Sequence, residues 1–230
     1  MKNIILVPYR DREIDMKYFL ENSYPLLRKN IENLKIVIVE QENGKPFNRG
    51  ITINIGFQEM EKESNGVVNN YFTHDIDVNP FEHTIKEIYN KSIDDDLVVG
   101  IYTSRCNTLG GIIKFNSNVF KKINGFANNF WGWGCEDKDL QNRVELYNIK
   151  IIKNILKNTE KAKKYFKVFD NYERDRRFYN KYHSFVYNKW KSIKKNEKEK
   201  YVIENGLSTL KYEVVEKKIT EDIIKIKVKV

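Results

Sequence analysis

The residues best suited to chemistry lie at positions 125–143, in the stretch GFANNFWGWGCEDKDLQNR. Two glycines flank Trp133, and their backbone freedom would let its indole ring swing on a mobile loop. Three carboxylates follow at the start of an expected helix: Glu136, Asp137 and Asp139. A flat apolar ring suits the face of a pyranose and carboxylates suit its hydroxyl groups, so the pattern favours a sugar-binding site. Acidic residues also stabilise a helix N-terminus through its dipole, which is the alternative for the carboxylates taken alone.

Two more sets of polar side chains follow apolar segments of the chain. Arg10, Arg12 and Arg49 would make forked contacts to phosphate, and together they indicate a diphosphate site. Asp75 and Asp77 follow a third apolar segment. Residues two apart in an extended segment point the same way, so these two carboxylates would serve a divalent metal ion and a nucleotide together. The sequence has neither a Gly-x-Gly-x-x-Gly turn after its first apolar run nor a Walker motif, which argues against the usual dinucleotide and P-loop sites.

The elements that would position these residues alternate between strand and helix. Apolar runs predict strands at residues 4–7, 35–39, 67–72 and 97–102. Helical patterns are expected at residues 13–29 and 51–60. This order is typical of an α/β fold with a partly parallel sheet, in which ligands bind beyond the carboxyl ends of the strands. Residues 150–200 read as mainly helical and polar, and two strands with one wet face are expected at 210–215 and 223–230.

The composition is that of a globular protein. Of the 230 residues, 40% are hydrophobic and 13% are aromatic. No apolar run is long enough to cross a bilayer, and the N-terminal run ends at Pro8 without a cleavage site, so we expect neither a membrane span nor a signal peptide. Two cysteines, Cys106 and Cys135, are too few for a disulfide framework and favour a reducing compartment. These features predict a cytoplasmic protein or, alternatively, a domain cut from a longer protein.

The positive charge is concentrated in one region. The chain carries a net charge of +9, and residues 150–200 hold 17 Lys and Arg against 6 Asp and Glu. Such a region attracts nucleic acid or acidic glycans, or it is simply the solvated face of a helix. Trp131 and Trp133 lie among acidic residues that would repel phosphate, so we expect no nucleic-acid partner.

Five motifs occur in an order and spacing that resemble the β-1,4-galactosyltransferase family: VPYRDR, FNRG, HDID, LGG and GFANNFWGWGCEDKDLQNR. The closing segments NGLSTLKYEVV and IKIKVKV also resemble the end of that family, so the resemblance covers nearly the whole chain. It implies the GT-A fold of nucleotide-diphospho-sugar transferases, an α/β fold with a mixed, mostly parallel central sheet. It also implies an inverting, metal-dependent transfer of a hexose from a UDP-sugar donor to a hydroxyl of a glycan or glycoconjugate acceptor.

The resemblance implies roles for single residues as well. Contacts to the nucleotide sugar are implied for Pro8, Arg10, Arg12, Phe47, Arg49, Asp75 and Trp133. A metal ligand is implied at Asp77, with Mn²⁺ as the expected ion and Mg²⁺ as the alternative. Glu136 corresponds to the acid that binds the sugar, and Asp137 corresponds to the catalytic base.

Three departures from the family pattern carry further expectations. The chain lacks the Met-x-x-His metal ligands. Asp170 or Asn171 is expected to take the place of the histidine, with Tyr172 and His183 as further alternatives, unless Asp77 and the diphosphate hold the ion alone. Thr108 precedes the sugar-lining pair Gly110 and Gly111, where galactose-specific members carry a tyrosine, which predicts room for the N-acetyl group of UDP-N-acetylgalactosamine. Lys138 replaces an aspartate near the acceptor and favours an acidic acceptor, such as a uronic acid or a phosphorylated sugar.

These observations predict a single glycosyltransferase domain over residues 1–230. We expect a nucleotide-sugar-binding half at residues 1–115 and an acceptor-binding half at residues 116–230, the second containing the basic helical region 150–200. The predicted function is the transfer of galactose or N-acetylgalactosamine. The alternative, motivated by the missing Met and His, is a catalytically inactive sugar-binding module on the same fold.

Overall fold

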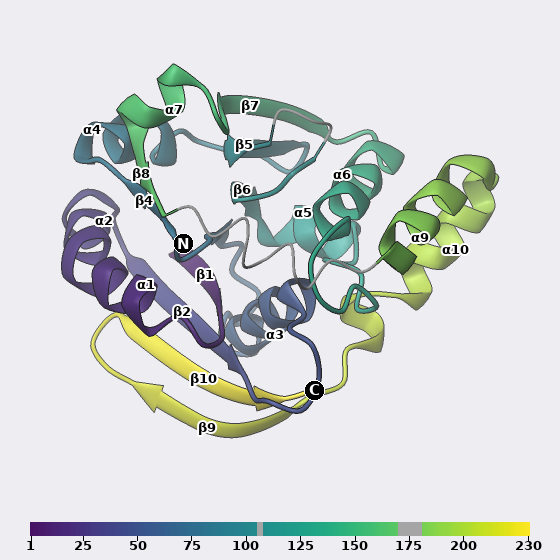
Figure 1. The fold of residues 1–230 in the computed structure, drawn as a ribbon, viewed down its shortest axis with the longest axis horizontal. Helices are drawn as coiled ribbons and strands as arrows, with labels where there is room; N and C mark the ends of the chain where they lie inside the picture. Colours follow the sequence, from purple (N-terminus) through teal and green to yellow (C-terminus); the bar gives the residue numbers. More distant parts are fainter. Residues whose placement is uncertain (105–107, 170–180) are drawn as a thin grey trace.

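A computed structural model describes residues 1–104, 108–169 and 181–230 of the chain. Its framework is an eight-stranded sheet with the strand order β7-β5-β6-β3-β1-β2-β10-β9, which runs through the whole molecule (Figure 1). The strands are β1 (Asn3–Tyr9), β2 (Leu34–Gln41), β3 (Asn70–Thr73), β5 (Leu97–Thr103), β6 (Ile112–Asn116), β7 (Lys150–Leu156), β9 (Glu213–Ile219) and β10 (Ile223–Lys229). A second, two-stranded sheet pairs β4 (Val78–Pro80) with β8 (Phe166–Val168).

The centre of the large sheet is parallel. Strand β1 lies between β2 and β3 and is parallel to both, β10 is parallel to β2, and β7 is parallel to β5. Strand β6 is antiparallel to its neighbours β3 and β5, and β9 is an antiparallel edge strand beside β10. This mixed, mostly parallel sheet confirms the expected fold class. Because β1, β2 and β3 run in the same direction, the segments that leave them emerge at one edge of the sheet.

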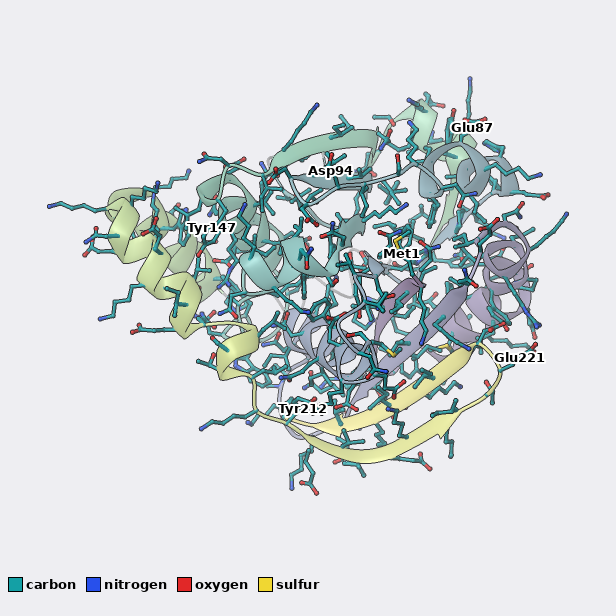
Figure 2. All side chains as sticks on the ribbon, turned by 180° about the vertical axis from the view of Figure 1, so that it is seen from behind. Met1, Glu87, Asp94, Tyr147, Tyr212 and Glu221 are labelled. Atoms are coloured by element: carbon teal, nitrogen blue, oxygen red, sulfur yellow. The ribbon has the colours of Figure 1, made fainter. Side chains whose placement is uncertain are left out.

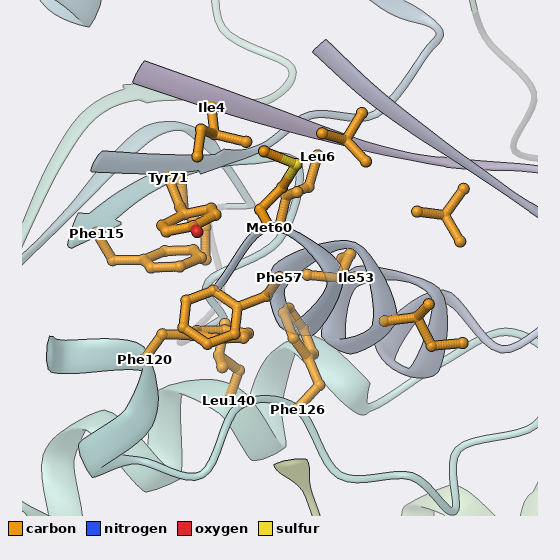
Figure 3. Packing of buried hydrophobic residues seen from close by; sticks show 14 of the residues in the cluster. Ile4, Leu6, Ile53, Phe57, Met60, Tyr71, Phe115, Phe120, Phe126 and Leu140 are labelled. Atoms are coloured by element: carbon orange, nitrogen blue, oxygen red, sulfur yellow. The ribbon is translucent and has the colours of Figure 1, made fainter. Parts of the chain in front are cut away.

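One face of the sheet is covered by α3 (Arg49–Glu61), α5 (Ser117–Lys122) and α6 (Glu136–Leu146). Figure 3 shows the packing there, where Phe57 of α3 lies between Tyr71 and Phe120, with ring centroids 4.7 Å from each. A Cβ on Gly56 would lie 3.0 Å from a methyl carbon of Val39, so this glycine lets α3 approach the sheet closely. The expected helix at residues 51–60 is confirmed within α3.

The other face is covered by shorter helical segments. These are α1 (Glu13–Tyr18), the π-helical turn η1 (Phe19–Ser23), α2 (Tyr24–Asn30), α4 (Glu82–Thr84), the π-helical turn η2 (Ile85–Tyr89) and α7 (Glu160–Tyr165). Phe19, Leu27 and Ile85 are fully buried against this face. The helix expected at residues 13–29 is therefore present, with a π turn in its middle.

The C-terminal region completes the fold. Helices α9 (Lys181–Ser192) and α10 (Lys195–Glu204) lie beside α6 and project from the body of the molecule, and η3 (Leu207–Thr209) leads back to β9 and β10 (Figure 1). The alternation in β10 places Ile224, Ile226 and Val228 in the core, as expected for a strand with one wet face. The turn between β9 and β10 lies against α2, where Arg28 pairs with Glu221 (Figure 2).

The reading of residues 150–200 as mainly helical is wrong for part of that region, because it contains β7 and β8. Strand β7 is an edge strand of the sheet, and its polar residues Lys150, Lys153 and Asn154 interrupt the apolar run that would have predicted it. Strand β6, which carries the buried Lys114, was also not predicted from the sequence. The Lys114 ammonium donates hydrogen bonds to the carbonyl oxygens of Tyr89 (2.8 Å) and Lys91 (2.6 Å). These backbone bonds compensate for the burial of a charged side chain within the strand.

Candidate active site

The predicted site residues come together where the parallel strands end. Arg10 and Arg12 follow β1, Arg49 begins α3 after β2, and Asp75 and Asp77 follow β3. The N-terminus of α6, with its acidic residues, lies at the same edge. The segment from residue 74 to residue 77 is a turn, closed by the bond from Val78 N to the Asp75 carbonyl (3.2 Å), and not the extended segment that the sequence suggested.

Arg49 is placed by the capping of α3. The Asn48 Oδ1 atom accepts from Ile51 N at 2.9 Å, which is the usual N-cap bond, and Asn48 N donates to Gln41 Oε1 at 2.8 Å. Asn48 is fully buried. The cap therefore fixes the first helical residue, Arg49, relative to the end of β2.

The Arg49 guanidinium joins two of the predicted site carboxylates. Its Nε donates to Asp75 Oδ1 (2.8 Å), its Nη1 donates to Asp137 Oδ1 (2.9 Å) and its Nη2 donates to the Gly111 carbonyl (3.2 Å). Charge-assisted bonds of this kind fix the orientation of both partners. Two motifs about 60 residues apart in the sequence, HDID after β3 and GCEDKD at α6, thus meet on one side chain.

The glycines of the LGG motif make room for this cluster. A Cβ on Gly110 would collide with the carboxylate of Asp137, and a Cβ on Gly111 would collide with the Tyr102 carbonyl. Gly111 also has φ +83°, a conformation that disfavours other residues. The backbone of the motif is tied to α6 by the bond from Leu109 N to the Asp137 carbonyl (3.2 Å).

The electrostatic environment differs from one carboxylate to the next. Burial raises the pKa of Asp137 to about 7, with Arg49 opposing the rise and the negative charges of Glu136 and Asp75 adding to it. Burial likewise raises the pKa of Glu136. Burial would also raise the pKa of Asp75, but the positive charges of Arg49, Lys157 and Arg12 together outweigh it and hold that pKa below its usual value. Since 26% of the Asp137 side chain stays exposed, a carboxyl with a pKa near neutrality remains within reach of a ligand.

A second ion pair lies beside the first. Arg12 Nη1 is 3.0 Å from Asp77 Oδ2, and Asp77 is held in place by its backbone carbonyl, which accepts from Phe169 N at 2.9 Å. Arg10 stacks over the Phe47 ring at 5.4 Å and donates to the Lys45 carbonyl. The arginines predicted to converge therefore do so through protein partners at the same edge of the sheet.

The tryptophan loop connects to this second group. Gly132 and Gly134 have φ of +89° and +118°, so the backbone on each side of Trp133 adopts conformations that favour glycine. Gly132 N donates to the Phe47 carbonyl at 2.8 Å, and Trp133 is 37% exposed. The indole of Trp133 is therefore partly exposed on a loop that is tied to Phe47.

Other predicted residues have different surroundings. Asp139 is buried and pairs with the fully buried Arg143 at 2.6 Å, so it supports the interior of α6 and is separate from the cluster at Arg49. Thr108 is buried beside the LGG motif, while Lys138 is half-buried on α6. Asp170 lies outside the described residues. Within residues 1–104, 108–169 and 181–230, no group of three or more His, Cys, Asp or Glu is arranged to hold a metal ion.

One charged residue of this edge was missed by the sequence analysis. Lys157 follows directly after β7, and its positive charge acts on both Asp75 and Asp137. A predicted strand at residues 150–156 would have revealed it as a residue at a strand end. A hollow of about 540 Å³ lies elsewhere, at the amino ends of β1 and β2, and is lined by Arg28, Lys35 and Asp222.

The fold of this chain is the GT-A fold. Two solved structures of Drosophila β-1,4-galactosyltransferase 7 share the fold, with TM-scores of 0.75 and 0.74 at 22% identity, and the match covers 100% of this chain and 94% of each of those chains. The first is a mutant in complex with manganese, UDP-Gal and xylobiose.

Sequence comparisons identify the family. The model of the N-terminal region of glycosyl transferase group 7 matches residues 1–90, and the model described as the N-terminal domain of galactosyltransferase matches residues 99–169. Human β-1,4-galactosyltransferase 4 is 39% identical over 152 residues, which cover 64% of this chain and 43% of that protein. Bovine β-1,4-galactosyltransferase 1 is 30% identical over 147 residues, which cover 62% of this chain and 36% of that protein. The chain belongs to the β-1,4-galactosyltransferase family, as its motifs suggested.

The family membership contradicts the location expected from the sequence. The prediction of a cytoplasmic protein is wrong, because the β-1,4-galactosyltransferase relatives are Golgi enzymes. The matched stretch spans less than half the length of these curated relatives. In the described part of the chain, no helix combines the length and the apolar character that a membrane crossing requires.

Proposed function

We propose that this chain transfers a hexose from a UDP-sugar to a hydroxyl of a glycan acceptor, with inversion at the anomeric carbon. The observation that carries the proposal is the position of Asp137, which is fixed by Arg49 at 2.9 Å and has a pKa raised to about 7. A general base works best when its pKa lies near the operating pH, and such help contributes roughly 10²–10⁴-fold to a rate. Asp137 would take the proton of the acceptor hydroxyl as the oxygen attacks the sugar.

The donor would bind along the edge formed by the ends of β1, β2 and β3. Arg10 and Arg12 suit the diphosphate, because a guanidinium makes forked contacts to phosphate oxygens. Pro8 and Phe47 would flank the uracil ring of the donor. Trp133 would close over the sugar and exclude water. Glu136 and Asp75 would accept hydrogen bonds from sugar hydroxyls. The bond from Gly132 to Phe47 supports a link between donor binding and the position of the tryptophan loop.

Asp77 fits a divalent cation. Its carboxylate offers hard oxygen atoms, keeps 15% exposure and lies beside Arg12 at the edge where the diphosphate would bind. A bound Mn²⁺, or alternatively Mg²⁺, would neutralise negative charge on the leaving diphosphate. Asp170 is proposed as a further ligand, and an Asp170→Ala variant whose activity depends on Mn²⁺ as the wild type does would exclude it.

Thr108 supports a donor with a substituent at C2. The side chain is buried, and its Oγ1 has no hydrogen-bond partner in the structure as described. A buried hydroxyl without a partner is costly, and a bound N-acetyl group would supply one. We propose that UDP-N-acetylgalactosamine is used at least as well as UDP-galactose. Lys138, half-buried on α6, would favour an acidic acceptor.

A screen of UDP release tests the function. The chain is incubated with several UDP-sugars and with neutral and acidic glycan acceptors, in Mn²⁺ and in a chelator. We expect acceptor-dependent UDP release that needs the metal ion, and Asp137→Asn should keep UDP-sugar binding while losing most of the transfer. Donor binding without turnover by the wild type would favour the sugar-binding module instead, and near-normal turnover by Asp137→Asn would remove Asp137 from the base role. Strict use of UDP-galactose would refute the donor proposal.

A further inference from the structure

Lys157 reaches the candidate active site from the outer part of the sheet. The residue follows β7, and its backbone N–H donates to the Thr103 carbonyl at the end of β5 (2.7 Å). Strands β5 and β7 are parallel, with Thr103 opposite Leu156. The chain therefore leaves both strands together, and Lys157 lies beside the end of β5.

The glycine pair of that motif gives the Lys157 side chain its place. A Cβ on Gly111 would lie 3.2 Å from Lys157 Cε, and the Lys157 ammonium lies 5.5 Å from the centre of the Tyr102 ring. The neighbouring Gly110 leaves room for the carboxylate of Asp137 in the same way. Because Gly110 and Gly111 have no side chains, the Asp137 carboxylate and the Lys157 side chain can both lie against the same turn of the chain.

The charges of the cluster explain why a second cation is useful. Four charged groups face Asp137: Arg49 from α3, Asp75 from the turn after β3, Glu136 from α6 and Lys157 from the end of β7. Arg49 alone is opposed by three carboxylates, and buried charges of one sign are costly when opposite charges are fewer. The positive charge of Lys157 favours the ionised form of Asp137 and lowers its pKa, against the larger effect of burial.

We propose that Lys157 is a positioning residue of the transfer reaction, whose ammonium balances the carboxylate cluster from the side of the Gly110–Gly111 turn. This inference rests on the proposed function, because it concerns the state of Asp137 as the base. Lys157 acts through Asp137 and needs no contact with the sugar. Its side chain keeps Asp137 unprotonated at a lower pH than Arg49 alone would allow.

The test is the pH profile of transfer by the wild type and by Lys157→Met, Lys157→Gln and Lys157→Arg. Removing the positive charge should move the acid limb of kcat/KM to higher pH by on the order of one unit, with about tenfold less transfer below the limb. Lys157→Arg should keep the wild-type limb because it keeps the charge. Lys150→Met is the matched control, since it removes an exposed lysine at the opposite end of the same strand.

The outcomes separate the two proposals. The role of Lys157 is supported if the acid limb of kcat/KM moves to higher pH in Lys157→Met and Lys157→Gln. The limb should stay in place in Lys157→Arg and Lys150→Met. If Lys157 only supports the structure, its neutral variants should transfer less at every pH while the acid limb of kcat/KM stays at the same pH. That result in folded Lys157→Met and Lys157→Gln would overturn the inference. If Lys157→Met does not fold, Lys157→Gln decides. A wild-type chain that binds UDP-sugar but transfers none at any pH overturns the proposed function, and the inference falls with it.

Discussion

Gly110 and Asp137 occupy complementary space, so that a Cβ added to the glycine would collide with the carboxylate. The two residues come from separate motifs, and the backbone bond from Leu109 N to the Asp137 carbonyl holds them in register. The LGG motif is therefore shaped by the group that lies against it. This explains a requirement for glycine that backbone conformation alone does not explain, since Gly110 does not have a positive φ.

Gly110→Ala should displace the Asp137 carboxylate from Arg49 and reduce transfer by roughly 10²-fold or more, within the range attributed to a general base. The expected loss is in kcat, while binding of UDP in the presence of Mn²⁺ should change little. Steady-state kinetics and calorimetry of UDP binding measure the two effects. Gly66→Ala is a suitable control, because that exposed turn glycine has open space around it, so only its φ of +81° adds strain. Unchanged kcat in Gly110→Ala would show that the carboxylate can move aside without cost.

Asp137→Asn should stabilise the folded protein at high pH. The pKa of Asp137 is raised to about 7 in the folded state, mainly by burial, against roughly 4 in the unfolded chain. Between these values the folded state holds a proton that the unfolded state has lost, so the contribution of this group to stability is lost as the pH rises through 7. Asparagine does not ionise, and its advantage over aspartate should grow from pH 5 to pH 8. Urea unfolding at both pH values measures the difference, and a difference independent of pH would contradict the raised pKa.

Much of this arrangement could be predicted from the sequence, but the ion pairs could not. The motifs located Asp75, Asp77 and Asp137 correctly at the ends of strands and at the start of α6. Periodicity failed where tertiary contacts override it, as in β6, whose Lys114 is satisfied by two backbone carbonyls. It also failed in β7, an edge strand whose apolar residues are interrupted by Lys153 and Asn154, and with it Lys157 was missed. No local pattern could assign the partners of Arg49, because its two carboxylates lie 26 and 88 positions away.

Asp77→Asn should abolish the effect of Mn²⁺ on donor binding. The Asp77 carboxylate is the proposed ligand of the ion, and asparagine keeps its size while removing the charge. We expect the wild type to bind UDP more tightly with Mn²⁺ than with a chelator, and the variant to bind it equally weakly in both. Isothermal titration with and without the metal measures this. Asp15→Asn is a control that removes a largely buried carboxylate of α1. A variant at Asp77 that keeps the full metal response would place the ion elsewhere.

Arg143→Met should destabilise the whole fold without a direct effect on the chemistry. Arg143 is fully buried, pairs with Asp139 at 2.6 Å and donates to the Asn205 carbonyl at 2.7 Å, so it ties α6 to the end of α10. Removing one partner of a buried ion pair leaves the other charge without compensation, which costs about 3–5 kcal/mol. Urea unfolding should show this loss, whereas Lys200→Met, which removes one member of an exposed pair on α10, should change stability by less than about 0.5 kcal/mol. Equal stability of the two variants would mean that Asp139 finds another partner or takes up a proton. If Asp139 takes up a proton, the Arg143→Met variant should lose stability as the pH rises. Urea unfolding at pH 5 and pH 8 would detect this loss.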